Sequence, residues 1–269
     1  MKKYIRYELD RLIYMPGRTI YGVYIQLNPR VLFEVGIIRE ISDIIASRGI
    51  PIIHLLLSVP NMALSMEPIN LTVFIDLTGR ENLINDLINE FRVLDYVEKV
   101  RTIKPIRNGL AVEDVFFPVT VLGERAVILR KPGIDAFING LRRELGEAYE
   151  SILYHIGFEL GSEFYKSHIK LAGGDKDLVV KIACELFRIA GFGIIEVTKF
   201  NYDEMYGELI VRDNFECKSV GSSNSPSGFF VGGILAGWIS EYFGREIRVR
   251  EVECIAKGDE YCRYVIEKI

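Results

Sequence analysis

The sequence predicts an α+β protein built from two parts. Between residues 21 and 103, short β-rich runs alternate with amphipathic helix patterns in the order β-α-β-β-α-β. The remainder combines long helix patterns with a strand meander, an apolar glycine-rich helix and a closing hairpin. Because 49% of the 269 residues are hydrophobic and 26% are charged, the chain has enough apolar material for two packed cores.

In the first part, the helix over 32–45 is indicated by apolar residues at spacings of three and four, and Gly49 follows as a C-cap glycine. A second helical pattern covers 81–94. The strands are expected at 21–27, 50–59, 69–76 and 96–103. This order is the split βαβ, or ferredoxin-like, arrangement, with both helices on one face of an antiparallel sheet. We expect a first domain over 1–112, and expect a partner subunit or the second domain to cover its other sheet face.

The first part resembles the ACT domain, a regulatory module. Such domains start the first helix with a Pro-Gly-x-Leu turn that lets an amino acid approach the backbone. Here the turn reads Pro29-Arg30-Val31-Leu32, with an arginine in place of the permissive glycine. Two interpretations stay open, an amino-acid site and a dimerisation or docking module, and the arginine favours the second.

The second part, over 113–269, is also expected to combine helices and strands. A connector over 105–114 leads to a hairpin of 117–122 and 125–129 around Gly123-Glu124. Helices are predicted at 134–145, 149–171, 178–189 and 229–243. Strands are predicted at 194–200, 208–212, 215–220, 247–256 and 261–266.

The chemistry lies in the closing hairpin, where Cys254 and Cys262 flank the turn over 257–260. Neighbouring strands lie about 5 Å apart, so both sulfurs can reach one ion. Glu251 would face the other side of a regular strand and joins them only if the backbone is bulged. Cys217, expected on the strand before the loop, is the nearest candidate for a fourth ligand, and water or a backbone group is the alternative. Thiolates with a carboxylate suit zinc, and buried unligated thiols or a disulfide are the alternatives.

The same region resembles the 4-vinyl reductase domain family. The resemblance rests on Ala236-Gly237, Phe243-Gly244-Arg245, Glu251, Cys254, Gly258 and Cys262, and is tight over 206–266. It implies an α/β fold like those of haem-NO-binding and TRAPP trafficking proteins, with a buried pocket for an apolar ligand. In phenol-sensing members it implies a metal site of one Glu and three Cys. The Glu and two Cys match, whereas the third Cys position falls on Gly228.

Candidate ligand-binding residues follow from the same resemblance and from the apolar helix over 229–243. Val211 takes the position of a tryptophan that contacts phenol in the phenol sensors. Trp238, Val249 and His155 complete the candidate set. The simpler interpretations are a core tryptophan and a structural helical histidine. A pocket lined in this way favours a small hydrophobic or aromatic molecule.

Several function classes are disfavoured. The net charge of −4 does not match a nucleic-acid backbone, so we do not expect direct nucleic-acid binding. There is no signal-peptide pattern, no long uncharged apolar run and no nucleotide-binding or hydrolase motif. The chain is therefore expected to be a cytoplasmic, homodimeric ligand-binding sensor without enzymatic activity, signalling through the ACT-like part to a partner such as a transcription regulator. The alternatives are a tetrapyrrole-related reductase accessory and a trafficking-like adaptor.

Overall fold

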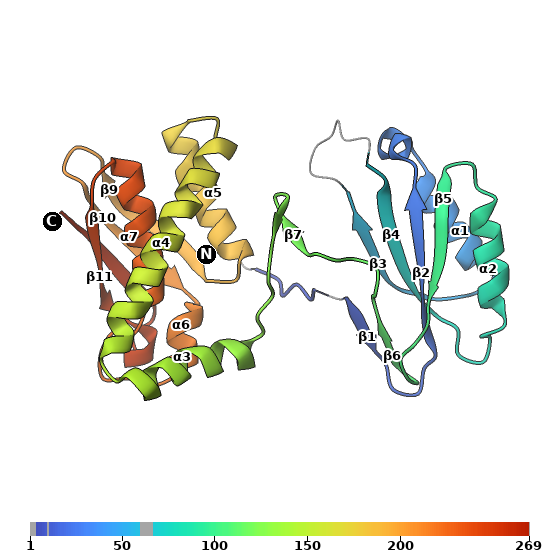
Figure 1. Cartoon of the computed structure of the whole chain (residues 1–269), viewed down its shortest axis with the longest axis horizontal. Helices are drawn as coiled ribbons and strands as arrows, with labels where there is room; N and C mark the ends of the chain where they lie inside the picture. Colours follow the sequence, from blue (N-terminus) through green and yellow to red (C-terminus); the bar gives the residue numbers. More distant parts are fainter. Residues whose placement is uncertain (1–3, 10, 60–66, 269) are drawn as a thin grey trace. The chain divides into compact units, whose positions relative to one another are not determined.

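The computed structural model describes residues 4–9, 11–59 and 67–268 (Figure 1). The chain forms two compact units that divide between Val127 and Ile128. This division lies later in the chain than the expected boundary after residue 112.

The N-terminal unit is built on a four-stranded antiparallel sheet in the order β3-β4-β2-β5. Its strands are β2 (Ile20–Leu27), β3 (Ile52–Ser58), β4 (Ile69–Asp76) and β5 (Val97–Ile103). Helices α1 (Ile37–Ala46) and α2 (Leu83–Arg92) pack their apolar residues on one face of this sheet (Figure 1). The predicted ferredoxin-like βαββαβ arrangement is therefore confirmed.

The turn before α1 forms a short 3₁₀ helix, η1 (Pro29–Phe33). The side chain of Asn28 caps it by accepting a hydrogen bond from the amide of Arg30 at 3.0 Å. Gly36 then begins α1 in the left-handed region, at φ 98°. The continuous helix expected over 32–45 is thus two helices, because Asn28 and Gly36 each start a new one.

The second face of this sheet is covered in part by the chain itself. Strands β1 (Leu12–Tyr14) and β6 (Leu110–Val112) pair into a ribbon that the sequence did not predict. Ile13 and Ala111 of the ribbon pack in one apolar cluster with Ile20 and Phe74 of the sheet. Part of the cover expected from a partner or from the second domain therefore comes from residues on either side of the βαββαβ core.

The hairpin expected at 117–129 forms, but only with the two-residue strands β7 (Thr120–Val121) and β8 (Glu124–Arg125). Gly123 makes its turn at φ 82°.

The C-terminal unit has its own four-stranded antiparallel sheet in the order β11-β12-β10-β9. The strands are β9 (Ile194–Asn201), β10 (Tyr206–Arg212), β11 (Ile247–Glu253) and β12 (Cys262–Lys268). The helices are α3 (Lys131–Leu145), α4 (Ala148–Leu171), α5 (Lys176–Ile189), α6 (Phe215–Val220) and α7 (Phe229–Phe243), with the 3₁₀ helix η2 (Ile255–Lys257). None of the helices among the described residues has the length and hydrophobicity of a membrane-spanning helix.

Helix α7 is buried on nearly all sides and lies directly against α4 (Figure 1). The two helices touch backbone to backbone through glycines. A Cβ at Gly233 would lie 2.1 Å from the carbonyl oxygen of Tyr154, and one at Gly161 would lie 2.0 Å from that of Ile234. This contact explains why a helix pattern so rich in glycine is stable, since only glycine allows the backbones to approach so closely.

The strand predicted at 215–220 was wrong, because these residues form helix α6. Apolar Phe215 and Cys217 alternate with polar Glu216 and Lys218, which fits a strand period. However, Asn214 accepts a hydrogen bond from the amide of Glu216 at 3.1 Å and starts a helix. Cys217 therefore lies on a helix and not on a strand.

Candidate metal centre

Four side chains from two separate segments meet in the C-terminal unit: Cys217, Glu251, Cys254 and Cys262. Their potential ligand atoms all lie within 4.8 Å of one another. The three cysteines are buried free thiols, and the glutamate is half-buried. Cys217 comes from α6, whereas the others come from the hairpin of β11 and β12. The structure thus brings together all four residues predicted as metal ligands.

The separations fit one tetrahedral ion. Cys217 Sγ lies 3.5 Å from Cys254 Sγ, 3.6 Å from Cys262 Sγ and 3.6 Å from Glu251 Oε1. With Zn–S distances of about 2.3 Å, a tetrahedral site has sulfur–sulfur edges of about 3.8 Å and sulfur–oxygen edges of about 3.5 Å. Three thiolates and one carboxylate in a buried place suit zinc better than a hard cation such as Mg²⁺. The residues present therefore fit a zinc ion.

Glu251 reaches the cluster because β11 is bulged. The sequence predicts that Glu251 can join the cysteines only with such a bulge. The register with β12 shifts between Glu251, opposite Tyr264, and Glu253, opposite Arg263. The extra residue lets Glu251 and Cys254 face the same interior although three positions separate them. Asp259 then fixes the turn by accepting a hydrogen bond from the amide of Cys254 at 2.8 Å.

Gly228 is close to the cluster but offers no ligand. A Cβ at this position would lie 2.1 Å from the hydroxyl of Tyr264 and 3.0 Å from Oε1 of Glu251. A cysteine at this position would therefore displace Tyr264. The third thiol comes instead from α6, through Cys217.

Burial and mutual contact perturb the ionisation of the cluster. Contact with Cys217 and Cys262 lowers the pKa of Cys254, and contact with Cys254 raises the pKa of Cys217. The contact with Cys217 lowers the pKa of Cys262, but Cys254 and burial outweigh it, so the net direction is upward. Burial raises the pKa of Glu251 to about 7. A bound cation would displace the protons of the thiols whose pKa is raised, Cys217 and Cys262.

Three buried polar residues beside the cluster were missed by the sequence interpretation. Glu216 on α6 accepts hydrogen bonds from the amides of Phe230 and Val231, each at 2.9 Å, and burial raises its pKa to about 8. Asn214 donates to the hydroxyl of Tyr264 at 2.9 Å. The signal available in the sequence was the capping pattern Asn214-Phe-Glu216, which marks a helix start.

Comparisons with known proteins assign part of the C-terminal unit to a known domain family. The sequence model of the 4-vinyl reductase domain family matches residues 208–268. This segment holds Glu251, Cys254 and Cys262, and the match confirms the predicted resemblance. Residues 208–268 form a 4-vinyl reductase domain.

Individual relatives cover parts of the chain. The protein MJ0150 of Methanocaldococcus jannaschii is 30% identical over 122 residues, which are 45% of this chain and 66% of that protein. Among solved structures, the phenol-responsive sensory domain of the transcription activator PoxR, with phenol, is 22% identical with a TM-score of 0.49, covering 53% of this chain and 76% of its own. A vinyl-4-reductase family protein from Methanocaldococcus jannaschii is 18% identical with a TM-score of 0.37. The match covers 54% of this chain and 84% of that protein.

One of the similar solved structures is an ACT domain. The ACT domain of GTP pyrophosphokinase from Chlorobium tepidum is 14% identical with a TM-score of 0.25, covering 32% of this chain and 97% of its own.

Of the four residues predicted to bind a ligand, three lie in the apolar core of the C-terminal unit and one is exposed. Val211 and Val249 are buried in the main apolar cluster of the C-terminal unit, and Val211 is opposite Cys262 in the sheet. Trp238 packs against the same cluster and donates a hydrogen bond to Nδ1 of His168 at 3.2 Å. His155 is exposed on α4. The first three share one core, and their role in ligand binding stays a prediction.

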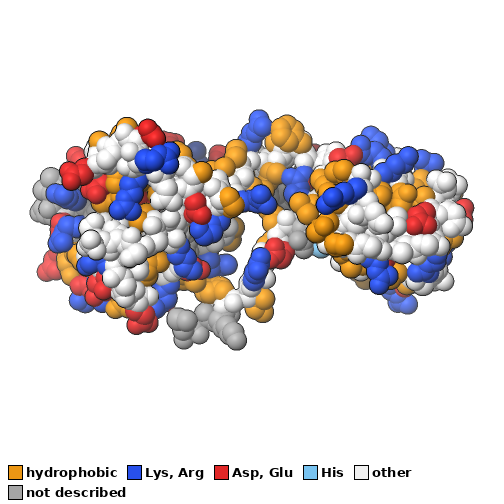
Figure 2. All heavy atoms as spheres, turned by 90° about the horizontal axis from the view of Figure 1, so that it is seen from below, with side chains coloured by type: hydrophobic (Ala, Val, Ile, Leu, Met, Phe, Trp, Pro, Cys, Tyr) orange, Lys and Arg blue, Asp and Glu red, His pale blue; other side chains and the backbone are white. Residues whose placement is uncertain are grey.

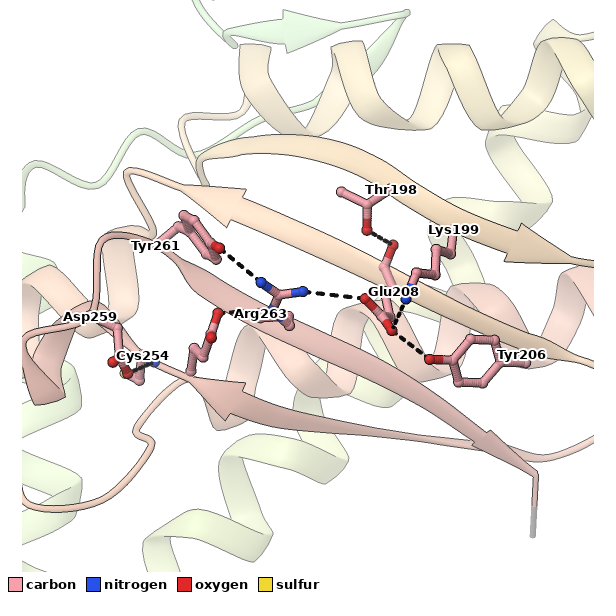
Figure 3. A network of polar contacts seen from close by, with 9 residues as sticks. Thr198, Lys199, Tyr206, Glu208, Cys254, Asp259, Tyr261 and Arg263 are labelled. Atoms are coloured by element: carbon pink, nitrogen blue, oxygen red, sulfur yellow. Dashed lines mark hydrogen bonds and ion pairs between the residues drawn. The ribbon is translucent and has the colours of Figure 1, made fainter.

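The outer face of the C-terminal sheet carries a network of ion pairs (Figure 3). Arg263 pairs with Glu253 at 2.8 Å and with Glu208 at 3.2 Å, and Lys199 pairs with Glu208 at 2.8 Å. These contacts, with Lys199 first, lower the pKa of Glu208 to about 2. Acidic and basic side chains are interspersed over the visible face of the C-terminal unit (Figure 2). Through Arg263 the network links β12 to β10 and β11 on the sheet face opposite the cysteine cluster.

Proposed function

We propose that this chain is a metal-stapled regulatory protein whose 4-vinyl reductase domain holds a small apolar or aromatic molecule. The observation that carries the proposal is the four-residue cluster of Cys217, Glu251, Cys254 and Cys262, with all ligand atoms within 4.8 Å of one another. The ion ties helix α6 to the closing hairpin. It thereby fixes the end of the domain around its apolar core.

The metal is structural and not catalytic in this proposal. Four protein ligands complete the tetrahedral coordination of zinc, whereas catalytic zinc sites keep one position open for water or substrate. The site is also buried, with Cys254 and Cys262 each 0% exposed. A closed and buried site supports a binding protein in preference to an enzyme.

The ligand is expected to be apolar because the core of the C-terminal unit consists mainly of apolar side chains. Helix α7 contributes Val231, Ile234, Leu235 and Ile239 to that core, and the sheet contributes Val211 and Val249. Polar anchors there are few, so an aromatic ring with at most one hydroxyl fits the chemistry. In this proposal the ACT-like unit dimerises and signals to a partner protein, without direct contact to DNA.

The four cysteines include an internal control for the metal. Cys184 lies on α5 outside the cluster, and the other three line it. Purified wild type and Cys184→Ser are expected to carry about one zinc per chain by elemental analysis, and Cys254→Ser about none. Equal metal content in wild type and Cys254→Ser would contradict the metal assignment.

The ligand is tested by thermal unfolding of zinc-loaded protein with a panel of phenols, alkylbenzenes and fatty acids. A bound ligand raises the midpoint as its concentration rises above Kd. We expect stabilisation by at least one aromatic compound and none by polar sugars or nucleotides. No shift across the whole panel, together with no co-purified small molecule by native mass spectrometry, would overturn the sensor assignment.

A further inference from the structure

The N-terminus of α7 has no cap from its own sequence. Its N-cap residue is Gly228, which has no side chain to accept a hydrogen bond. The free amides are satisfied from elsewhere: Oε2 of Glu251 accepts from the amide of Gly228 at 2.8 Å, and Glu216 accepts from Phe230 and Val231. Helix ends need such acceptors. The first turn of α7 therefore depends on carboxylates supplied by β11 and α6.

Gly228 is held on its other side as well. Its carbonyl accepts a hydrogen bond from the hydroxyl of Tyr264 at 3.2 Å. Asn214 fixes that hydroxyl by donating to it at 2.9 Å. The peptide at the start of α7 is thus clamped by two residues of the closing hairpin, Glu251 and Tyr264.

Glu251 belongs both to the candidate metal cluster and to the hydrogen bonds that hold the start of α7. Its Oε1 faces the sulfurs, 3.6 Å from Cys217 Sγ, while its Oε2 holds the amide of Gly228. We propose that Glu251 couples the metal ion to helix α7, with one carboxylate oxygen as the fourth ligand and the other as the cap of the helix. This inference rests on the metal assignment of the proposed function.

The charge of the Glu251 carboxylate determines how a bound cation would affect the cap of α7. With the cation present, Glu251 has a fixed partner and the cap stays in place. Without the cation, Oε1 has the thiol of Cys217, a weak donor 3.6 Å away, as its partner, so the carboxylate position that caps Gly228 is held less firmly. Metal binding should therefore order the first turn of α7.

The position of α7 is transmitted to α4 because the two helices meet at their backbones. A Cβ at Gly233 would be 2.1 Å from the carbonyl oxygen of Tyr154, so no flexible side chain lies between them to absorb a shift. Trp238 further along α7 donates to His168 of α4 at 3.2 Å. As the only tryptophan of the chain, Trp238 reports on this contact by its fluorescence.

The test is hydrogen exchange of the full chain, read by mass spectrometry, in saturating Zn²⁺ and after chelation. Zinc is expected to slow exchange of the amides at 228–231 by on the order of tenfold, since local opening of that turn becomes less favourable. Amides of α5 in the same unit are the internal control and should change little. The emission of Trp238 should change in step with zinc occupancy.

Two variants separate the steps. Cys254→Ser should lose zinc and with it every zinc-dependent change. Glu251→Gln, studied at saturating Zn²⁺, should still bind zinc through the three cysteines but lose most of the zinc-dependent protection at 228–231. Full protection in Glu251→Gln, or wild-type protein that binds one zinc without any change at 228–231, would overturn the coupling alone. Wild-type protein that binds no zinc would overturn both the coupling and the metal assignment.

Discussion

Replacing Gly233 by alanine tests the backbone contact between α7 and α4. The new Cβ would lie 2.1 Å from the carbonyl oxygen of Tyr154 and 2.9 Å from the amide nitrogen of Phe158, whereas ordinary contacts begin near 3.4 Å. The helices must therefore separate by more than about 1 Å, and overpacking of this kind costs about 1–3 kcal/mol. Since the obstacle is backbone, we take the upper end, and the higher helix propensity of alanine returns about 1 kcal/mol. The net expectation is a loss of about 2 kcal/mol.

The assay is urea unfolding followed by Trp238 emission, which reports on the C-terminal unit. Gly140→Ala is the matched control, because Gly140 is inside α3 with nothing within 4 Å of the added Cβ. That variant should be stabilised by up to about 1 kcal/mol. Equal stability of Gly233→Ala and Gly140→Ala would mean that the two helices are not in backbone contact.

Three further predictions concern the cluster and its surroundings. Zinc affinity should rise with pH between about 6 and 8 in calorimetric titrations, because the pKa values of Cys217 and Cys262 are raised and each proton released adds up to about tenfold per pH unit. Burial lowers the pKa of His168 to about 4; the unfolded chain therefore binds the proton first, and up to about 3 kcal/mol of stability should be lost as pH falls from about 6.5 to about 4. Replacing His168 by asparagine should remove that pH slope in urea unfolding, whereas replacing exposed His155 should leave it. Glu216→Ala should destabilise the C-terminal unit by about 2–4 kcal/mol in the same assay, because two buried amides of α7 lose their acceptor.

Much of the fold could be predicted because hydrophobic periodicity is a local signal. Strand 69–76 and helix 229–243 agree with β4 and α7 to the residue. The β1–β6 ribbon could not be predicted in this way. Its strands have three residues each and pair across the whole βαββαβ core, so no turn or alternation marks them.

The candidate metal centre was predictable in its ligands but not in all of its supports. The spacing of Cys254 and Cys262 around a turn, and the need for a bulge at Glu251, follow from strand geometry alone. Cys217 was placed on the wrong kind of element, because residues 215–220 show period-two alternation and the capping pattern at Asn214 was not considered. Glu216 was missed because its importance comes from burial against the distant start of α7, which sequence spacing does not report.

The central claim, that one glutamate and three cysteines bind a single metal ion, is tested most directly by zinc K-edge X-ray absorption of the purified, zinc-loaded protein. We expect three sulfur neighbours at about 2.3 Å and one oxygen at about 2.0–2.2 Å, with one sulfur lost in Cys217→Ser. A first shell of oxygen or nitrogen alone, or a spectrum that Cys217→Ser leaves unchanged, would contradict it.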